Sequence, residues 1–193
     1  MASACPATGS CPASDASKRE VFDAVVVGGG IAGSTTAAAL GRRGFKVLLC
    51  EAGLPNDKRL AGELLHPPGT AQLEALGLLE PLREAGGVPV YGFAVFKDGQ
   101  DSGTILSYSE VPGARAVGIA LEHAVLTRSL LSAVSRVPGV TVWDNARVLV
   151  AALDGEVPHV TVKRRGVEQT VAARFVVSAE GRASKLREQA GIA

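Results

Sequence analysis

The sequence predicts an α/β fold, in which a patch of antiparallel strands is inserted into a Rossmann-like parallel sheet. Three observations support this prediction. A strand, a glycine-rich turn, a helix and a second strand follow one another over residues 23–51. Apolar runs within residues 88–108 predict a pair of antiparallel strands. The last third of the chain holds short strands separated by turn residues, which predicts a return to the main sheet.

The first unit is predicted from buried strands of the kind found in parallel sheets. Residues 24–27 are a continuous run of Ala and Val, and residues 46–50, apolar after Lys46, are the second buried strand. A helix is expected between them over residues 32–43, and Gly44 is placed to end it. The preceding residues 1–20 are rich in Ala and Ser without apolar periodicity, so we expect a disordered tail ahead of one domain over residues 21–193.

The middle of the chain is predicted to contain helices and a strand pair. Pro55, Asn56 and Asp57 favour turns, so residues 54–63 are expected to form an irregular loop. The Asp98-Gly99 pair predicts the turn between two strands. The expected elements are helices over 67–76, 79–85 and 122–136, and strands over 88–96 and 104–108.

The last third is predicted to be mainly strands. Asp154-Gly155 and Arg165-Gly166 are natural turn sites between them. The expected strands are 140–143, 147–153, 159–164, 168–173 and 174–178, and a short helix is expected over 184–189.

Amino-acid composition limits which binding partners and which cellular compartment are expected for the protein. A net charge of +1 and an aromatic content of 4% predict no nucleic-acid partner. The three cysteines give neither a zinc-ligand set nor a complete disulfide framework, which favours a reducing cytoplasm. Residues 24–41 carry no charge, but their glycines and hydroxyl residues divide them into a strand and a helix. A soluble, cytoplasmic protein without a metal site is therefore expected.

The glycine-rich turn carries the chemistry. Residues 28–33 read GGGIAG and fit the pattern G-x-G-x-x-G. Gly28 permits the tight turn, Gly30 removes a side chain where the backbone approaches a pyrophosphate, and Gly33 lets the helix pack closely. The phosphates are then expected to lie against the free N–H groups at the start of the helix.

An acid at the end of the second strand completes this pattern. Glu51 follows Gly33 by 18 residues and is placed to accept hydrogen bonds from a ribose diol. Its carboxylate would repel a 2′-phosphate, so NADP is not expected as the primary ligand. A glycine turn in an ordinary α/β protein is the alternative interpretation. The glycines and the acid do not by themselves distinguish FAD from NAD.

Two further segments resemble a known family. Residues 59–67 (RLAGELLHP) and 73–78 (LEALGL) look like the second conserved region of group A flavin monooxygenases, in the squalene-epoxidase-like branch. Residues 178–187 (SAEGRASKLR) are similar to the ADGxxSxxR segment of the same family. Two departures from the family pattern are Glu180 in place of the usual Asp, and Glu122-His123 where an Arg often precedes the long helix.

The resemblance implies FAD as the cofactor and suggests which residues bind it. The implied contacts are Gly28, Gly30, Ala32 and Gly33 at the pyrophosphate, Glu51 at the adenosine ribose, Arg59 at the flavin-side phosphate or ribityl chain, Val148 at the adenine through its backbone, and Glu180 and Gly181 over the cofactor. Outside these contacts, His66 is interpreted as a packing or hydrogen-bonding residue rather than a catalytic acid. Glu63 is interpreted as a loop anchor rather than a general base.

The implied activity is that of an FAD-dependent monooxygenase or epoxidase acting on a small, apolar organic substrate. NAD(P)H would reduce the flavin, and oxygen would supply one atom to the substrate. The alternatives are a prenyl-chain flavin reductase, a flavin halogenase, or a truncated, non-catalytic FAD-binding module.

The family's later FAD-binding segment would lie beyond Ala193, so the chain resembles the N-terminal half of such an enzyme. A partner chain could supply the second half, and membrane association is expected only through sequence outside these residues. Where that half would pack, an exposed apolar face is expected.

Overall fold

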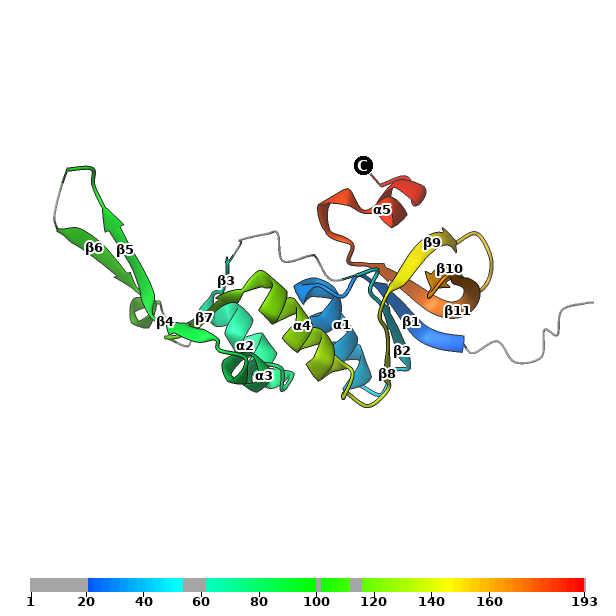
Figure 1. Cartoon of the computed structure of the whole chain (residues 1–193), viewed down its shortest axis with the longest axis horizontal. Coiled ribbons are helices and arrows are strands. Elements are labelled where there is room, and N and C mark those ends of the chain that lie inside the picture. Colours follow the sequence, from blue (N-terminus) through cyan, green and yellow to red (C-terminus); the bar gives the residue numbers. More distant parts are fainter. Residues whose placement is uncertain (1–20, 54–61, 100–101, 112–115, 193) are drawn as a thin grey trace, which may run out of the picture.

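The computed structural model describes residues 21–53, 62–99, 102–111 and 116–192. Its main sheet contains parallel and antiparallel strand pairs (Figure 1). In spatial order the strands are β8 (Val140–Trp143), β2 (Val47–Cys50), β1 (Val21–Val27), β11 (Val167–Ser178), β10 (His159–Arg164) and β9 (Ala146–Ala152). The predicted α/β class is confirmed. The predicted tail and most of the predicted 54–63 loop lie outside the described residues.

The strands β1 and β2 are apolar throughout because both faces of the sheet are covered. Val26 and Leu49 belong to the core shared with the helices, whereas Val25 and Leu48 belong to a second core on the opposite face. All four side chains are fully buried. Two-sided burial explains the continuous apolar runs, since an exposed face would require alternation with polar residues.

Helix α1 (Ile31–Gly41) connects β1 to β2, as predicted, and Figure 1 shows it beside α4 (His123–Val134). Ala37 and Ala38 of α1 and Leu126 and Leu130 of α4 are buried in one hydrophobic cluster. The amphipathic pattern that predicted α4 therefore corresponds to a real buried face. No helix among the described residues has both the length and the apolarity needed to cross a membrane.

Strand β11 corrects one prediction. Residues 168–173 and 174–178 were expected to be separate strands, but they are continuous and serve two partners. The first half pairs antiparallel with β10, and the second half pairs parallel with β1. Arg174 does not interrupt the strand because its side chain is exposed and lies 3.5 Å from Asp23. The predicted turn before β11 is confirmed, with Arg165 and Gly166 both at positive φ.

The inserted patch contains two strands that the sequence did not predict. Its three-stranded antiparallel sheet consists of β3 (Gly62–Leu65), β7 (Gly118–Glu122) and β4 (Val88–Val90). The interpretation of residues 62–63 as irregular loop is therefore wrong. Both missed strands are short and poor in β-branched residues, so propensity alone gave no signal. Helices α2 (Pro67–Ala75) and α3 (Leu79–Glu84) follow β3 and agree with the predicted pair.

A second antiparallel unit is the hairpin of β5 (Gly92–Phe96) and β6 (Gly103–Ser107). The predicted 88–96 strand is divided at Tyr91, because β4 pairs with β7 and β5 pairs with β6. Figure 1 shows the hairpin extending away from the rest of the chain. Its exposed apolar side chains are Phe93, Val95, Phe96, Ile105 and Leu106. The sequence predicted an exposed apolar face where the second half of the family fold would pack, and the packing of that half on this hairpin stays a prediction.

Cys50 is a buried structural residue, as its place in an apolar strand predicted. Its side chain lies in the second core, on the face of the sheet opposite helices α1 and α4, and the thiol is free. Desolvation raises the pKa of the thiol to about 12, although the nearby Arg164 guanidinium lowers it in part. The thiol is therefore protonated and unreactive at neutral pH.

Candidate dinucleotide-binding site

The turn after β1 is built around Gly28. Its N–H donates to the carbonyl of Cys50 (2.8 Å), which continues the contact between β1 and β2. The residue has φ +104°, and a Cβ added there would lie 2.4 Å from the carbonyl oxygen of Ala179. Backbone conformation and space therefore both require glycine at this position.

Gly33 brings the first turn of α1 against that loop. A Cβ at Gly33 would lie 1.8 Å from the carbonyl oxygen of Gly28, closer than any real contact. The buried hydroxyl of Ser34 donates to the carbonyl of Gly29 (3.0 Å) and fixes the same approach. This is the close packing that the third glycine of the motif predicts.

Gly30 differs from both of these glycines. A Cβ built on it would meet no atom within 4 Å, and its φ of −68° suits any residue. The fold itself therefore does not require glycine here. Gly30 is the N-cap of α1, and the exposed Ala32 lies in the first helical turn. The absence of a side chain leaves room for a phosphate at the positive end of the helix.

Glu51 is held at the edge of the same turn. One carboxylate oxygen accepts from the N–H of Gly29, and the other accepts from the N–H of Gly53 (2.8 Å). Each carboxylate oxygen can accept more than one hydrogen bond. The backbone thus orients Glu51 and leaves it able to accept from a ribose diol.

These residues line one cavity of about 530 Å³. Of the residues proposed from the sequence, Gly28, Gly30, Glu51, Val148, Glu180 and Gly181 line it. Ala32 and Gly33 are not among the lining residues, since Gly33 packs inward on the turn. Arg59 lies outside the described residues. The structure therefore gathers sequence-predicted positions from four separate segments of the chain around one space.

The cavity also has lining residues that the sequence reasoning did not select. They are Ala52, His123, Arg147, Leu149, Ala179 and Lys185. Arg147 and Leu149 flank Val148 on β9, and Lys185 begins α5 (Lys185–Gln189). Their proximity to the turn depends on the strand order of the main sheet. The sequence signals were that Arg147 directly precedes the predicted contact Val148 and that Lys185 lies within the segment 178–187.

His123 and Glu63 form a pair beside the cavity. His123 Nδ1 lies 2.7 Å from Glu63 Oε1, and both side chains are partly buried. The pair exists because β3 and β7 are hydrogen-bonded neighbours and α4 begins directly after β7. Since a carboxylate only accepts, Nδ1 carries the hydrogen, and Nε2 is the ring nitrogen left for a ligand. Glu63 is an anchor, as interpreted from the sequence, but it lies on a strand rather than in a loop.

The carboxylate of Glu180 organises its own segment. Its Oε2 accepts from the Ser184 hydroxyl (2.7 Å) and the Leu186 N–H (3.0 Å). The Ser178 hydroxyl is a more distant donor at 3.3 Å. The longer Glu side chain therefore reaches into the start of α5. A direct contact of Glu180 with the cofactor stays a prediction.

His66 has a packing and hydrogen-bonding role, as interpreted from the sequence. Its Nδ1 lies 2.7 Å from the Tyr108 hydroxyl. Its ring also packs near the rings of Phe93 and Tyr108, with centroids 5.7 and 5.9 Å away. This cluster joins the base of the hairpin to the start of α2.

Known proteins resemble this chain over most of its length. The family model for an FAD binding domain matches residues 21–193. The chain is 35% identical over 173 residues to 6-methylpretetramide 4-monooxygenase of Streptomyces rimosus, covering 88% of this chain and 41% of that protein. It is 31% identical over 177 residues to squalene epoxidase erg1 of Aspergillus fumigatus, covering 89% and 36%.

A solved structure shows the same arrangement. The myxobacterial chondrochloren halogenase CndH, an FAD-dependent halogenase, superposes with a TM-score of 0.74 at 29% identity. That match covers 86% of this chain and 38% of the halogenase. The chain thus spans about two fifths of the length of these three proteins.

Proposed function

Because the chain belongs to the FAD-binding domain family, we propose that it is the FAD-binding part of a flavin-dependent monooxygenase acting on an apolar organic substrate. The observation that carries the proposal is the cavity in which Gly28, Gly30 and Glu51 meet Val148 and Gly181. Two similar proteins are named for oxygenation, one as a monooxygenase and one as a squalene epoxidase.

The residues present fit the ADP half of FAD. The pyrophosphate would lie on the N-terminus of α1 beside Gly30, where an added Cβ meets no protein atom. Glu51 would accept from the adenosine ribose, and the backbone of Val148 would meet the adenine. Arg59 would contact the flavin-side phosphate or ribityl chain, and Ala32, Gly33, Glu180 and Gly181 would complete the surroundings. A bound flavin would supply the redox chemistry, with NAD(P)H as the reductant.

The organisation of the whole protein follows from this assignment. We propose that residues 21–193 are the FAD-binding domain and that residues 1–20 lie outside it. The similar proteins are more than twice as long as their match to this chain. We infer that a polypeptide equivalent to their remaining length, in the same protein or in a partner chain, completes the flavin and substrate site.

Halogenation is the second candidate function, favoured by the structural similarity to an FAD-dependent halogenase. Both activities would use the same dinucleotide site, so the cavity does not separate them. Product analysis with the full-length protein distinguishes them, because a monooxygenase incorporates labelled oxygen into the substrate. A prenyl-chain reductase would incorporate none, and a non-catalytic module would yield no product.

A matched set of glycine substitutions tests FAD binding. Gly30→Ala should lower stability by no more than about 1 kcal/mol, the cost of alanine at an N-cap. It should weaken FAD binding about tenfold or more, because the methyl group enters the space assigned to the pyrophosphate. Gly33→Ala should lower stability by about 1–3 kcal/mol, since its Cβ overlaps the Gly28 carbonyl. Gly69→Ala, whose Cβ is also unobstructed, is the control outside the cavity. Flavin fluorescence titration and thermal melting provide the measurements.

Two results would contradict the proposal. One is the absence of FAD binding by the unsubstituted, folded chain at millimolar FAD. The other is equal FAD affinity in Gly30→Ala and Gly69→Ala, which would place the ligand away from the N-terminus of α1.

A further inference from the structure

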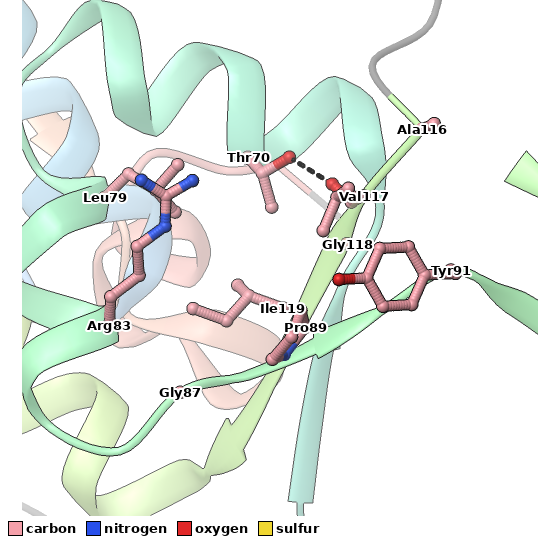
Figure 2. Close-up of a pocket in the computed structure, with 10 residues that line it drawn as sticks. All are labelled: Thr70, Leu79, Arg83, Gly87, Pro89, Tyr91, Ala116, Val117, Gly118 and Ile119. Atoms are coloured by element: carbon pink, nitrogen blue, oxygen red, sulfur yellow. Dashed lines mark hydrogen bonds between the residues drawn. The ribbon is translucent and has the colours of Figure 1, made fainter. Parts of the chain in front are cut away.

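A second cavity lies outside the dinucleotide site, between α2, α3 and the β4–β7 pair (Figure 2). Its volume is about 640 Å³, within the range of small-molecule sites. It is lined by Thr70, Leu79, Arg83, Gly87, Pro89, Tyr91 and residues 116–119. None of these residues lines the dinucleotide cavity, so the two spaces are separate.

The cavity walls are mainly apolar and offer few polar groups to a ligand. Leu79, Pro89 and Ile119 provide the apolar surface. The Thr70 hydroxyl is already engaged, because it lies within hydrogen-bond distance of the Val117 carbonyl (3.0 Å) and the Pro67 carbonyl (2.9 Å). Arg83 and Tyr91 are left to meet a ligand. Figure 2 shows these two side chains on opposite sides of the cavity, with Ile119 and Pro89 between them.

Among the described residues that line the cavity, Arg83 is the only charged side chain, and none is Asp or Glu. Its partner is Glu80, one turn earlier on α3, at 3.1 Å. Side-chain exposure is 50% for Arg83 and 66% for Glu80, so this ion pair contributes little stability. The Arg83 guanidinium can therefore exchange Glu80 for a ligand anion at small cost, and its fork suits a planar carboxylate.

We propose that this cavity binds a small apolar molecule that carries one carboxylate. Arg83 pairs with the carboxylate, and the apolar body lies across Leu79, Pro89 and Ile119. Tyr91 closes the opposite side with its ring and offers its hydroxyl. Its carbonyl accepts from the Tyr108 N–H (2.9 Å), so the ligand would contact the residue that joins β4 to the hairpin.

The test uses 2-naphthoate and its neutral analogue 2-naphthamide, titrated calorimetrically into the whole chain without FAD. The unsubstituted chain should bind the naphthoate and bind the amide about tenfold more weakly, because a charge-assisted pair is lost. Arg83→Gln should reduce naphthoate affinity by a similar factor, and Arg83→Lys should give an intermediate loss because it keeps the charge without the fork. The control is Arg43→Gln, which changes an exposed arginine in the turn after α1 and should leave naphthoate binding unchanged.

Three results would overturn the proposal. They are equal affinity for the acid and the amide, unchanged naphthoate binding by Arg83→Gln, and no naphthoate binding at millimolar concentration. Circular dichroism establishes that each variant is folded, which is expected because Arg83 is half exposed. The titration contains no flavin, so its outcome is independent of FAD binding.

Discussion

At the scale of single residues, the His123–Glu63 pair is the feature of the site that substitutions can test most directly. Glu63 fixes Nδ1, and Nε2 is left for a bound dinucleotide. We expect His123→Ala to weaken FAD binding about tenfold and to lower stability by about 1 kcal/mol or less, since it removes a partly exposed pair. His123→Asn can keep the hydrogen bond to Glu63 without Nε2, so it should lose FAD affinity but not stability. Equal FAD affinity in all three proteins would assign the pair a structural role only.

Cys50 leads to a prediction about pH. The pKa of its thiol rises from an ordinary value of 9.0 to about 12 on folding. The folded state therefore retains a proton that the unfolded state releases, and unfolding becomes easier as pH rises from about 9 towards 12. Below pH 9 this contribution to stability is fully present. Chemical denaturation should show a loss of stability over that pH window that is smaller in Cys50→Ala. An identical pH profile for the two proteins would show that the thiol does not contribute.

The sequence predicted the positions of some residues in the candidate site and missed the pairing of others. Gly28 and Gly33 were predictable because a local motif implies their contacts, and the structure shows both close approaches. Glu51 was predictable because it ends the strand that follows the motif. The pairing of His123 with Glu63 was not predictable, since it joins residues 60 positions apart through two strands that the sequence did not reveal.

At the scale of elements, strands bounded on both sides by turn residues were predicted best. The bounds of β8 and β10 agree with the prediction, because β-branched residues and turn signals mark both ends. Strands β3 and β7 were missed because they gain stability from pairing with each other rather than from local propensity. The division between β4 and β5 likewise depends on which strand each one pairs with.

The β5–β6 hairpin is the element whose apolar surface is most open to solvent. Ile105 is 72% exposed, and Phe96 is 61% exposed on the same face. Ile105→Lys should therefore change stability by no more than about 0.5 kcal/mol and reduce the binding of a hydrophobic fluorescent dye. Val167→Lys, at an exposed site beside the β10–β11 turn, is the control and should leave dye binding unchanged. A large drop in melting temperature for Ile105→Lys would show that this face is packed against the protein.

At the scale of the whole molecule, we propose that the described cavity serves one half of the dinucleotide. Its lining residues come from the β1–α1 turn, the end of β2, strand β9 and the segment after β11, together with His123 of α4 and Lys185 of α5. In the proposed assignment these positions meet the pyrophosphate, ribose and adenine. The chain spans about two fifths of the similar monooxygenases, so groups that would enclose the isoalloxazine ring are expected from the rest of the protein.

This division predicts the ligand selectivity of the isolated chain. ADP should compete with FAD at nearly the same affinity, because both present the pyrophosphate and adenosine to the same residues. FMN, which lacks the adenosine half, should bind at least about a hundredfold more weakly, since the contacts of Glu51 and Val148 would be lost. Displacement of FAD, followed by flavin fluorescence, measures both. If FMN bound as well as FAD while ADP failed to compete, the flavin would be the recognised half, and the assignment of Glu51 to the adenosine ribose would be wrong.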